Sequence, residues 1–413
     1  MKPFAFIFCG IIAIAARAQE APQQNASPGG YQTLIAAANS ILPGKSGYPS
    51  PSPVPEKPLS PRENLRRQRV SVARNAPALA LFHRALQLGV APPSAPPKSG
   101  FSPYATKFRE MARQLRQESD VRAANGDWNG ALQSRLDVVE LGAIVTRIGG
   151  GLLDDLVGSA IESLGLNSRR PNYDLTPLVF YLDAAQCRAG ALRLAKVDQS
   201  RISLGAIYQN EAPKTFALIR EYVSRPDWAT WIQTDKGRNE LGLQLTPDDA
   251  SQLARLSPAD FEARIKARFD LAAEKTQQPF AQMVPALTPA PDKMTEFLTA
   301  SHVGLARASH ERPILIARLI QSALELRAIE LEGGAFPATF AAPIDPFSGK
   351  PLIYSRAGEK YLLYSFGPDG RDDKGRVEIR KRTDFDFDSG TRITSIRRGI
   401  EVDAKGDILA PVF

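Results

Sequence analysis

The sequence predicts a mainly α-helical protein, either a helical bundle or a short solenoid, followed by a small C-terminal antiparallel β module. Apolar residues recur every three or four positions over most of residues 62–332, which is the period of an amphipathic helix. From Gly333 the pattern changes to short alternating stretches between turn residues, which is typical of strands. With 413 residues and 43% hydrophobic content, the chain can bury a sizeable core.

The first 18 residues are typical of a secretory signal peptide. Lys2 precedes an uninterrupted apolar run over residues 4–15, and the small-x-small triplet Ala16-Arg17-Ala18 follows it. A membrane anchor needs about 20 apolar residues, so this run is too short. We therefore expect cleavage after Ala18, a periplasmic or extracellular location and no transmembrane segment in the mature chain.

Residues 19–61 predict a disordered tether or leader. The segment is rich in Pro, Ser, Gln and Gly, and seven prolines lie between Pro43 and Pro61. Repeated proline removes backbone donors and fixes φ, which disfavours helices and sheets and favours an extended spacer. An α-helical domain over residues 62–332 is expected to follow it.

Within this domain, residues 104–139 predict a helical hairpin. Apolar residues at helical spacing precede and follow the sequence Asn125-Gly126-Asp127, which breaks the helix. The unit resembles one repeat of a tetratricopeptide-type (TPR) array, so a solenoid built from it would be TPR-like.

Residues 149–166 form the most regular amphipathic stretch. Gly158 permits a close helix contact, while Asp154, Asp155 and Glu162 are expected on the side away from the apolar stripe. Adjacent aspartates early in a helix complement its dipole. The helix, glycine-rich turn and helix together resemble uncharacterised exported bacterial proteins that carry a similar C-terminal module.

Further residues are interpreted as structural. Helices are expected to begin near Thr176, Thr246 and Ser257, each followed by proline. Trp228 and Trp231 are expected to anchor a core. Cys187, the one cysteine outside the signal peptide, is interpreted as a small buried residue.

The sequence contains none of the local motifs that mark common chemistries, such as a phosphate-binding loop, a serine-hydrolase elbow or a paired-histidine zinc motif. His83, His302 and His310 are scattered and are interpreted as ordinary core or surface residues. No catalytic and no cofactor-binding residue is predicted. A site assembled in space from Asp, Glu or Ser would leave no local spacing.

Lys and Arg outnumber Asp and Glu by eight, or by six without the signal peptide. We interpret this surplus as dispersed, favouring solubility and weak attraction to anionic envelope surfaces. The dense run of Arg62, Arg66, Arg67, Arg69 and Arg74 is interpreted as a solvated helix start. No basic patch is interleaved with aromatic residues, so no nucleic-acid partner is expected.

The C-terminal module spans residues 333–382, with a β tail over 383–413. The Asp345-Pro346 turn with Gly349, the two tyrosine-containing strands and the sequence Ser365-Phe366-Gly367-Pro368-Asp369-Gly370 give it a distinctive order. Over about residues 320–375 the chain resembles the globular part of the major pseudopilins of type II secretion systems. Pseudopilins begin with a prepilin cleavage motif, whereas this chain begins with an ordinary signal peptide, so a filament subunit is not expected.

The pseudopilin resemblance implies one metal site. Such proteins bind calcium in the loop after the second strand, and here that loop contains Ser365, Asp369, Asp372 and Asp373. Solvated turns are the alternative. The alternating Asp384, Asp386 and Asp388 are expected on a strand.

Two functions are therefore expected from the sequence. The first is an exported, non-enzymatic binding or assembly protein of the envelope, with an envelope protein as partner and no cofactor except possible calcium. The alternative is a periplasmic hydrolase with a carboxylate-based site in the helical domain.

Overall fold

The computed structural model describes residues 29–42, 60–91, 104–166, 176–241, 245–278, 280, 295, 303–376, 379–386, 391–398 and 408–409. The expected signal peptide lies outside these residues. Within them the protein is mainly helical with a small C-terminal β module, which confirms the predicted fold class. In this described part, no helix combines the length and the apolar character needed to cross a membrane.

The helices are α2 (Gly30–Ser40), α3 (Pro61–Leu88), α4 (Ala105–Ala124), α5 (Trp128–Gly149), α6 (Leu152–Leu166), α7 (Thr176–Phe180), α8 (Ala184–Gln199), α9 (Leu204–Val223), α10 (Trp228–Trp231), α11 (Asp235–Glu240), α12 (Pro247–Leu253), α13 (Pro258–Lys275) and α15 (Val303–Gly333). The strands are β1 (Ile353–Ala357), β2 (Lys360–Ser365), β3 (Ile379–Asp386), β4 (Thr391–Arg398) and β5 (Ile408–Leu409).

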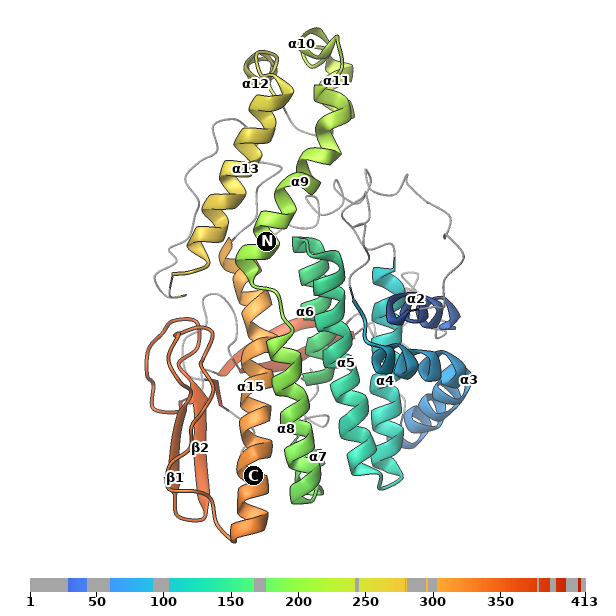
Figure 1. The fold of residues 1–413 in the computed structure, drawn as a ribbon, viewed down its shortest axis with the longest axis vertical. Coiled ribbons are helices and arrows are strands. Elements are labelled where there is room, and N and C mark those ends of the chain that lie inside the picture. The colour runs from blue at the N-terminus through green and yellow to red at the C-terminus, as the bar shows by residue number, and fades with distance from the viewer. Residues whose placement is uncertain are drawn as a thin grey trace.

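Helices α4, α5, α6, α8 and α15 lie side by side as a bundle (Figure 1). The predicted hairpin is confirmed as α4 and α5, joined by a turn in which Gly126 has φ 81° and the Asp127 side chain accepts from the Gly130 amide. Helices α5 and α6 lie so close together that a Cβ on Gly158 would be 2.5 Å from the Gly142 carbonyl oxygen and 2.2 Å from Thr146 Oγ1. The close contact expected at Gly158 is therefore present.

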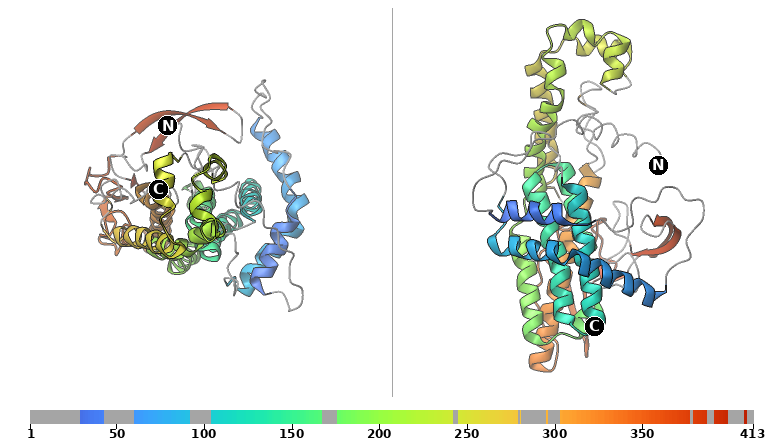
Figure 2. Two further views of the ribbon diagram at one scale, coloured as in Figure 1. Left: turned by 90° about the horizontal axis from the view of Figure 1, so that it is seen from above. Right: turned by 90° about the vertical axis from the view of Figure 1, so that its right-hand side faces the viewer.

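The N-terminal layer corrects the predicted tether. Residues 30–40 form α2, whose Leu34, Ala37 and Ala38 are buried in a core shared with α3 and α4. Residues 29–42 contain no proline, so every amide can join the helix, and the alanines allow close packing. Apart from 29–42 and 60–61, the segment 19–61 lies outside the described residues. Helices α2 and α3 lie across the bundle, as Figure 2 shows.

A helical arm extends from one end of the bundle (Figure 1). Helices α9 and α13 pack against each other, with α10, α11 and α12 at the tip. The arm has its own apolar core, which contains Trp228 and Trp231 and confirms their predicted role. Thr246 and Ser257 each form a capping box at the start of a helix, as their sequences predict.

The β module packs against α15. Strands β1 and β2 form an antiparallel hairpin in which Ile353 pairs with Tyr364, and its two-residue turn places Gly358 at φ 63°. Phe347 and Leu363 are buried in a cluster with residues of α15. The Asp345 carboxylate accepts from the Phe347 amide at 3.0 Å, which closes the predicted turn.

Strand pairing crosses the expected boundary between residues 382 and 383. Strand β3 spans it and pairs with β4, and β5 pairs with β2 of the module. Backbone hydrogen bonds therefore join the expected tail to the module. Asp384 and Asp386 lie on a strand as predicted, and Asp388 lies outside the described residues.

Candidate functional site

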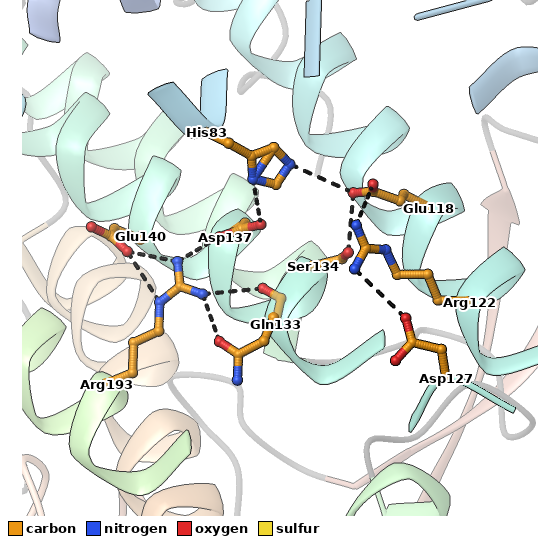
Figure 3. A network of polar contacts seen from close by, with 9 residues as sticks. All are labelled: His83, Glu118, Arg122, Asp127, Gln133, Ser134, Asp137, Glu140 and Arg193. Atoms are coloured by element: carbon orange, nitrogen blue, oxygen red, sulfur yellow. Dashed lines mark hydrogen bonds and ion pairs between the residues drawn. The ribbon is translucent and has the colours of Figure 1, made fainter. Parts of the chain in front are cut away.

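Two groups of paired polar side chains stand out among the described residues, each built around a histidine and an aspartate from different helices. We call the first the His83 cluster; Figure 3 shows its members, which are His83, Glu118, Arg122, Asp127, Gln133, Ser134, Asp137, Glu140 and Arg193. We call the second the His310 cluster; its members are Asp155, Glu162, Asp198, Arg201, Arg307, His310, Glu311 and Arg318.

In the His83 cluster, an imidazole lies between two carboxylates (Figure 3). His83 Nδ1 of α3 is 3.5 Å from Asp137 Oδ2 of α5, and its Nε2 is 3.9 Å from Glu118 Oε2 of α4. The Ser134 hydroxyl donates to the same Glu118 oxygen at 3.0 Å. One histidine therefore connects three helices and faces acids on both ring nitrogens.

Arg193 of α8 supplies the positive charge of this cluster. Its guanidinium bonds Asp137 and also donates to Glu140 at 2.8 Å and to the Gln133 side chain at 3.0 Å. Burial raises the pKa of Asp137, although the Arg193 charge opposes this effect. The His83 side chain is 34% exposed and that of Asp137 only 6%, so water reaches the imidazole and hardly reaches the acid.

An open depression of about 470 Å³ lies along α5 beside this cluster. The end of α3 and the residues after it form one wall, and α5 forms the other; the lining residues are Leu86, Gly89, Val90, Ala91, Glu140, Ile144 and Arg147. Glu140 belongs to both the depression and the His83 cluster. Arg147 donates to the Val90 carbonyl at 2.8 Å and so ties the two walls together. A solute in the depression would lie near a carboxylate, a guanidinium and an apolar wall.

The His310 cluster lies inside the bundle. His310 Nδ1 of α15 is 2.8 Å from Asp155 Oδ1 of α6, and both side chains are almost fully buried. Arg201, which follows α8, forms a bidentate pair with Glu162 that includes a bond of 2.7 Å. Arg318 of α15 donates to Asp198 of α8 at 2.8 Å. Three elements are thus joined by ion pairs; the pairs of Asp155 and Glu162 are almost fully buried, and the pair of Asp198 with Arg318 is partly exposed.

The electrostatics of the His310 cluster favour bound protons. Burial alone would lower the pKa of His310, but the charge and hydrogen bond of Asp155 outweigh it and the pKa is raised. Burial raises the pKa of Glu162 against the effect of Arg201. Burial also raises the pKa of Glu311 to about 7, although Arg307 opposes it.

The burial of the α6 acids corrects the sequence interpretation. Asp154, Asp155 and Glu162 were expected on the side of the helix away from the apolar stripe, and that side is buried, because the three acids are 1%, 2% and 1% exposed. The side of α6 that carries the acids packs against other bundle helices and the base of the arm, whereas Leu153 and Leu156 of the predicted stripe are only partly buried and Ala160 is exposed. The acids are compensated by partners from these neighbours, including Lys214, whose Nζ lies 3.8 Å from Asp154 Oδ2.

The glycine turn before α6 belongs to the same arrangement. Glu211 of α9 accepts from the Leu152 amide at 2.9 Å, so a carboxylate of the arm caps the start of α6. Burial raises the pKa of Glu211. A Cβ on Gly151 would lie 2.6 Å from Glu211 Oε2, so a larger residue at this junction between bundle and arm would displace the capping carboxylate.

Ser365 is the last residue of β2, and Asp369, Asp372 and Asp373 lie in the loop that follows; the side chains of Ser365, Asp369 and Asp372 stabilise turns there. Ser365 Oγ accepts from the Gly367 amide at 2.9 Å, and Asp369 accepts from the Arg371 amide at 3.1 Å. Asp372 accepts from the Lys374 amide and from the Tyr364 hydroxyl. In the described part of the chain, no three His, Cys, Asp or Glu side chains converge as a metal site.

Calcium binding at Ser365, Asp369, Asp372 and Asp373 stays a prediction. If the ion binds the folded protein there, millimolar calcium should raise the thermal unfolding midpoint and chelator should reverse the shift. Asp369→Ala should abolish the shift, whereas an unchanged midpoint in calcium would remove the prediction.

Sequence reasoning missed both histidine clusters. His310 and Asp155 are 155 positions apart, and His83 and Asp137 lie on different helices, so no local spacing joins them. The sequence of α6 did not mark its acids as buried, because its apolar residues predict an ordinary amphipathic helix. His302 lies outside the described residues. Cys187 is buried as predicted, and burial raises the pKa of its thiol to about 11.

Comparison of the chain with protein-family models, with curated proteins and with solved structures found no match. The assignment of a function therefore depends on the geometry of the chain itself.

Proposed function

We propose that this chain is an exported, non-enzymatic binding or assembly protein of the cell envelope. The observation that carries the proposal is the arm formed by α9 to α13, which has its own apolar core and extends beyond the bundle (Figure 1). Such an arm presents exposed side chains around its tip, where another protein can contact them.

The bundle supports this proposal as a fixed base for the arm. Its buried charges form pairs between different elements, such as Glu162 with Arg201 and Asp155 with His310. Removing one member of such a pair leaves an uncompensated charge, so the pairs favour one arrangement of the helices. Glu211 and Lys214 extend the same network into the arm.

Site-specific photo-crosslinking tests this function. A photoreactive amino acid at Lys236, which is exposed in α11 at the tip, should form a covalent adduct with one envelope protein in intact cells. The matched control carries the same amino acid at Leu192, which is 57% exposed on α8 of the bundle. An adduct at neither position, or the same adducts at both, would contradict binding through the arm.

A hydrolase that uses the His83 cluster is the second candidate. The observation that favours it is a half-exposed imidazole between two carboxylates beside an open depression. His83 would act as the general base toward a water molecule, and Asp137 and Glu118, which lie on either side of the ring, would orient it. If this candidate is correct, the purified protein hydrolyses an ester, amide or glycoside, and both His83→Gln and Asp137→Asn abolish that activity.

A further inference from the structure

The positive charge of the chain is concentrated in one segment, contrary to the interpretation of a dispersed surplus. Residues 60–124 contain 12 Lys and Arg against four Asp and Glu, a surplus of eight that equals the formal surplus of the whole chain. Nine of these basic residues are exposed on α3 and α4: Arg62, Arg66, Arg67, Arg69, Arg74, Arg84, Lys107, Arg109 and Arg113.

The packing of α3 turns its arginines outward. Leu79, Phe82 and Ala85 are buried against α2 and the bundle, which places the charged side of the helix in solvent. The amino-terminal half of α3 reaches past the edge of the bundle (Figure 2). One acid offsets this half: Glu63 pairs with Arg66 at 2.9 Å and with Arg67 at 3.3 Å.

We propose that the exposed arginines of α3 form a docking surface for a bilayer rich in anionic phospholipid. The proposal rests on the proposed function, because an envelope protein meets such a surface. Charge complementarity selects an anionic partner. Val70 lies among these arginines and is 64% exposed. Its side chain can enter the headgroup region of a bilayer, whereas a polyanion in water offers it no apolar contact, so Val70 favours a bilayer as the anionic partner.

The expected effect follows from the number of charges. Each basic residue near an anionic leaflet contributes about fivefold to membrane affinity. Replacing Arg62, Arg66, Arg67 and Arg69 by glutamine should therefore lower the partition coefficient at least about tenfold, after allowance for Glu63. Raising the salt concentration should also lower the partition coefficient of the unaltered protein, because salt screens the attraction between the arginines and the lipid headgroups.

Vesicle sedimentation with the purified full chain tests the proposal. The probes are vesicles of phosphatidylcholine alone and of equal parts phosphatidylcholine and phosphatidylglycerol. A control variant removes the same number of charges from the arm, by replacing the exposed Arg220, Lys236, Arg255 and Lys266 with glutamine. A second variant changes the four α3 arginines to lysine, which keeps the charge. Matching unfolding midpoints establish that the variants fold.

The proposal expects binding to the anionic vesicles that is lost in the α3 glutamine variant and kept in the arm and lysine variants. If the arm variant loses vesicle binding to the same extent, binding depends only on the net charge of the protein, and the proposal is overturned. Equal binding to both kinds of vesicle would overturn it, as would complete displacement from vesicles by substoichiometric DNA or heparin. If the protein does not bind the vesicles but still forms the crosslink at position 236, this inference is refuted and the proposed function is not.

Discussion

The two histidine clusters use the same residue types and differ in their access to water. In each, a histidine contacts an aspartate on another helix and an arginine pairs with a nearby acid. The His83 side chain is 34% exposed, whereas that of His310 is 9% exposed. The difference teaches that position in the bundle, and not residue type, decides whether such a group holds helices together or is open to reaction.

The comparison also assigns the clusters different energetic weights. A charge in the interior cannot be rehydrated when its partner is removed, so the loss of a partner there is expensive. Near the surface, water replaces part of the lost interaction. Matched substitutions in the two clusters therefore test the comparison directly.

The largest contrast is expected between Arg201→Met and Arg193→Met. Arg201→Met leaves Glu162 buried without its partner and should lower the free energy of unfolding by about 3–5 kcal/mol. After Arg193→Met, Asp137 keeps the His83 ring 3.5 Å away, and the removed side chain is itself 23% exposed, so the loss should be smaller, about 1–2 kcal/mol. Urea unfolding at neutral pH measures both. Equal losses would show that the clusters do not differ in burial as described.

The second prediction concerns Glu311, whose pKa is raised to about 7 by burial. A raised pKa means that the folded state binds the proton more tightly than the unfolded state. Its contribution to stability is therefore complete below pH 4.5 and is lost as pH rises through about 7, by up to about 3 kcal/mol. Glu311→Gln, which mimics the neutral acid, should remove this decline. Unfolding curves from pH 4.5 to 8 would contradict the prediction if wild type and variant decline in parallel.

The third prediction compares the histidines. The pKa of His310 is raised above 6.5, so its pairing with Asp155 stabilises the fold fully below pH 6.5 and less as pH rises through the folded value. His310→Gln should cost about 2 kcal/mol at pH 6 and less at pH 9. His83→Gln should cost less than about 1 kcal/mol at pH 6. A larger loss for His83→Gln would invert the comparison.

The last prediction concerns the access of water-borne reagents to the two histidine rings, and chemical modification tests it without altering the stability of the fold. Diethyl pyrocarbonate should modify His83 in the native protein much faster than His310, because the His310 ring is buried against Asp155. Mass spectrometry of proteolytic fragments locates the modified ring. In denaturant the two histidines should react alike, and a persisting difference there would show that burial is not the cause.

The contrast also shows what could be read from the sequence. The α4–α5 hairpin, the capping boxes at Thr246 and Ser257 and the turn at Asp345 were predictable, because each depends on residues a few positions apart. Helix α2 was missed because the surrounding prolines outweighed a short proline-free stretch of alanines whose stability comes from packing on α3.

The sequence by itself determined the helical class, the turn between α4 and α5, the starts of α12 and α13, and the hairpin of the β module. These features follow from local periodicity, from capping and from the backbone freedom of residues such as Gly126 and Gly358. Only the tertiary structure decided that the acids of α6 are interior, that His310 meets Asp155 and that the arginines of α3 share one exposed face. The physical reason is that burial and charge pairing depend on which helices surround a residue, and that arrangement is set by contacts between distant parts of the chain.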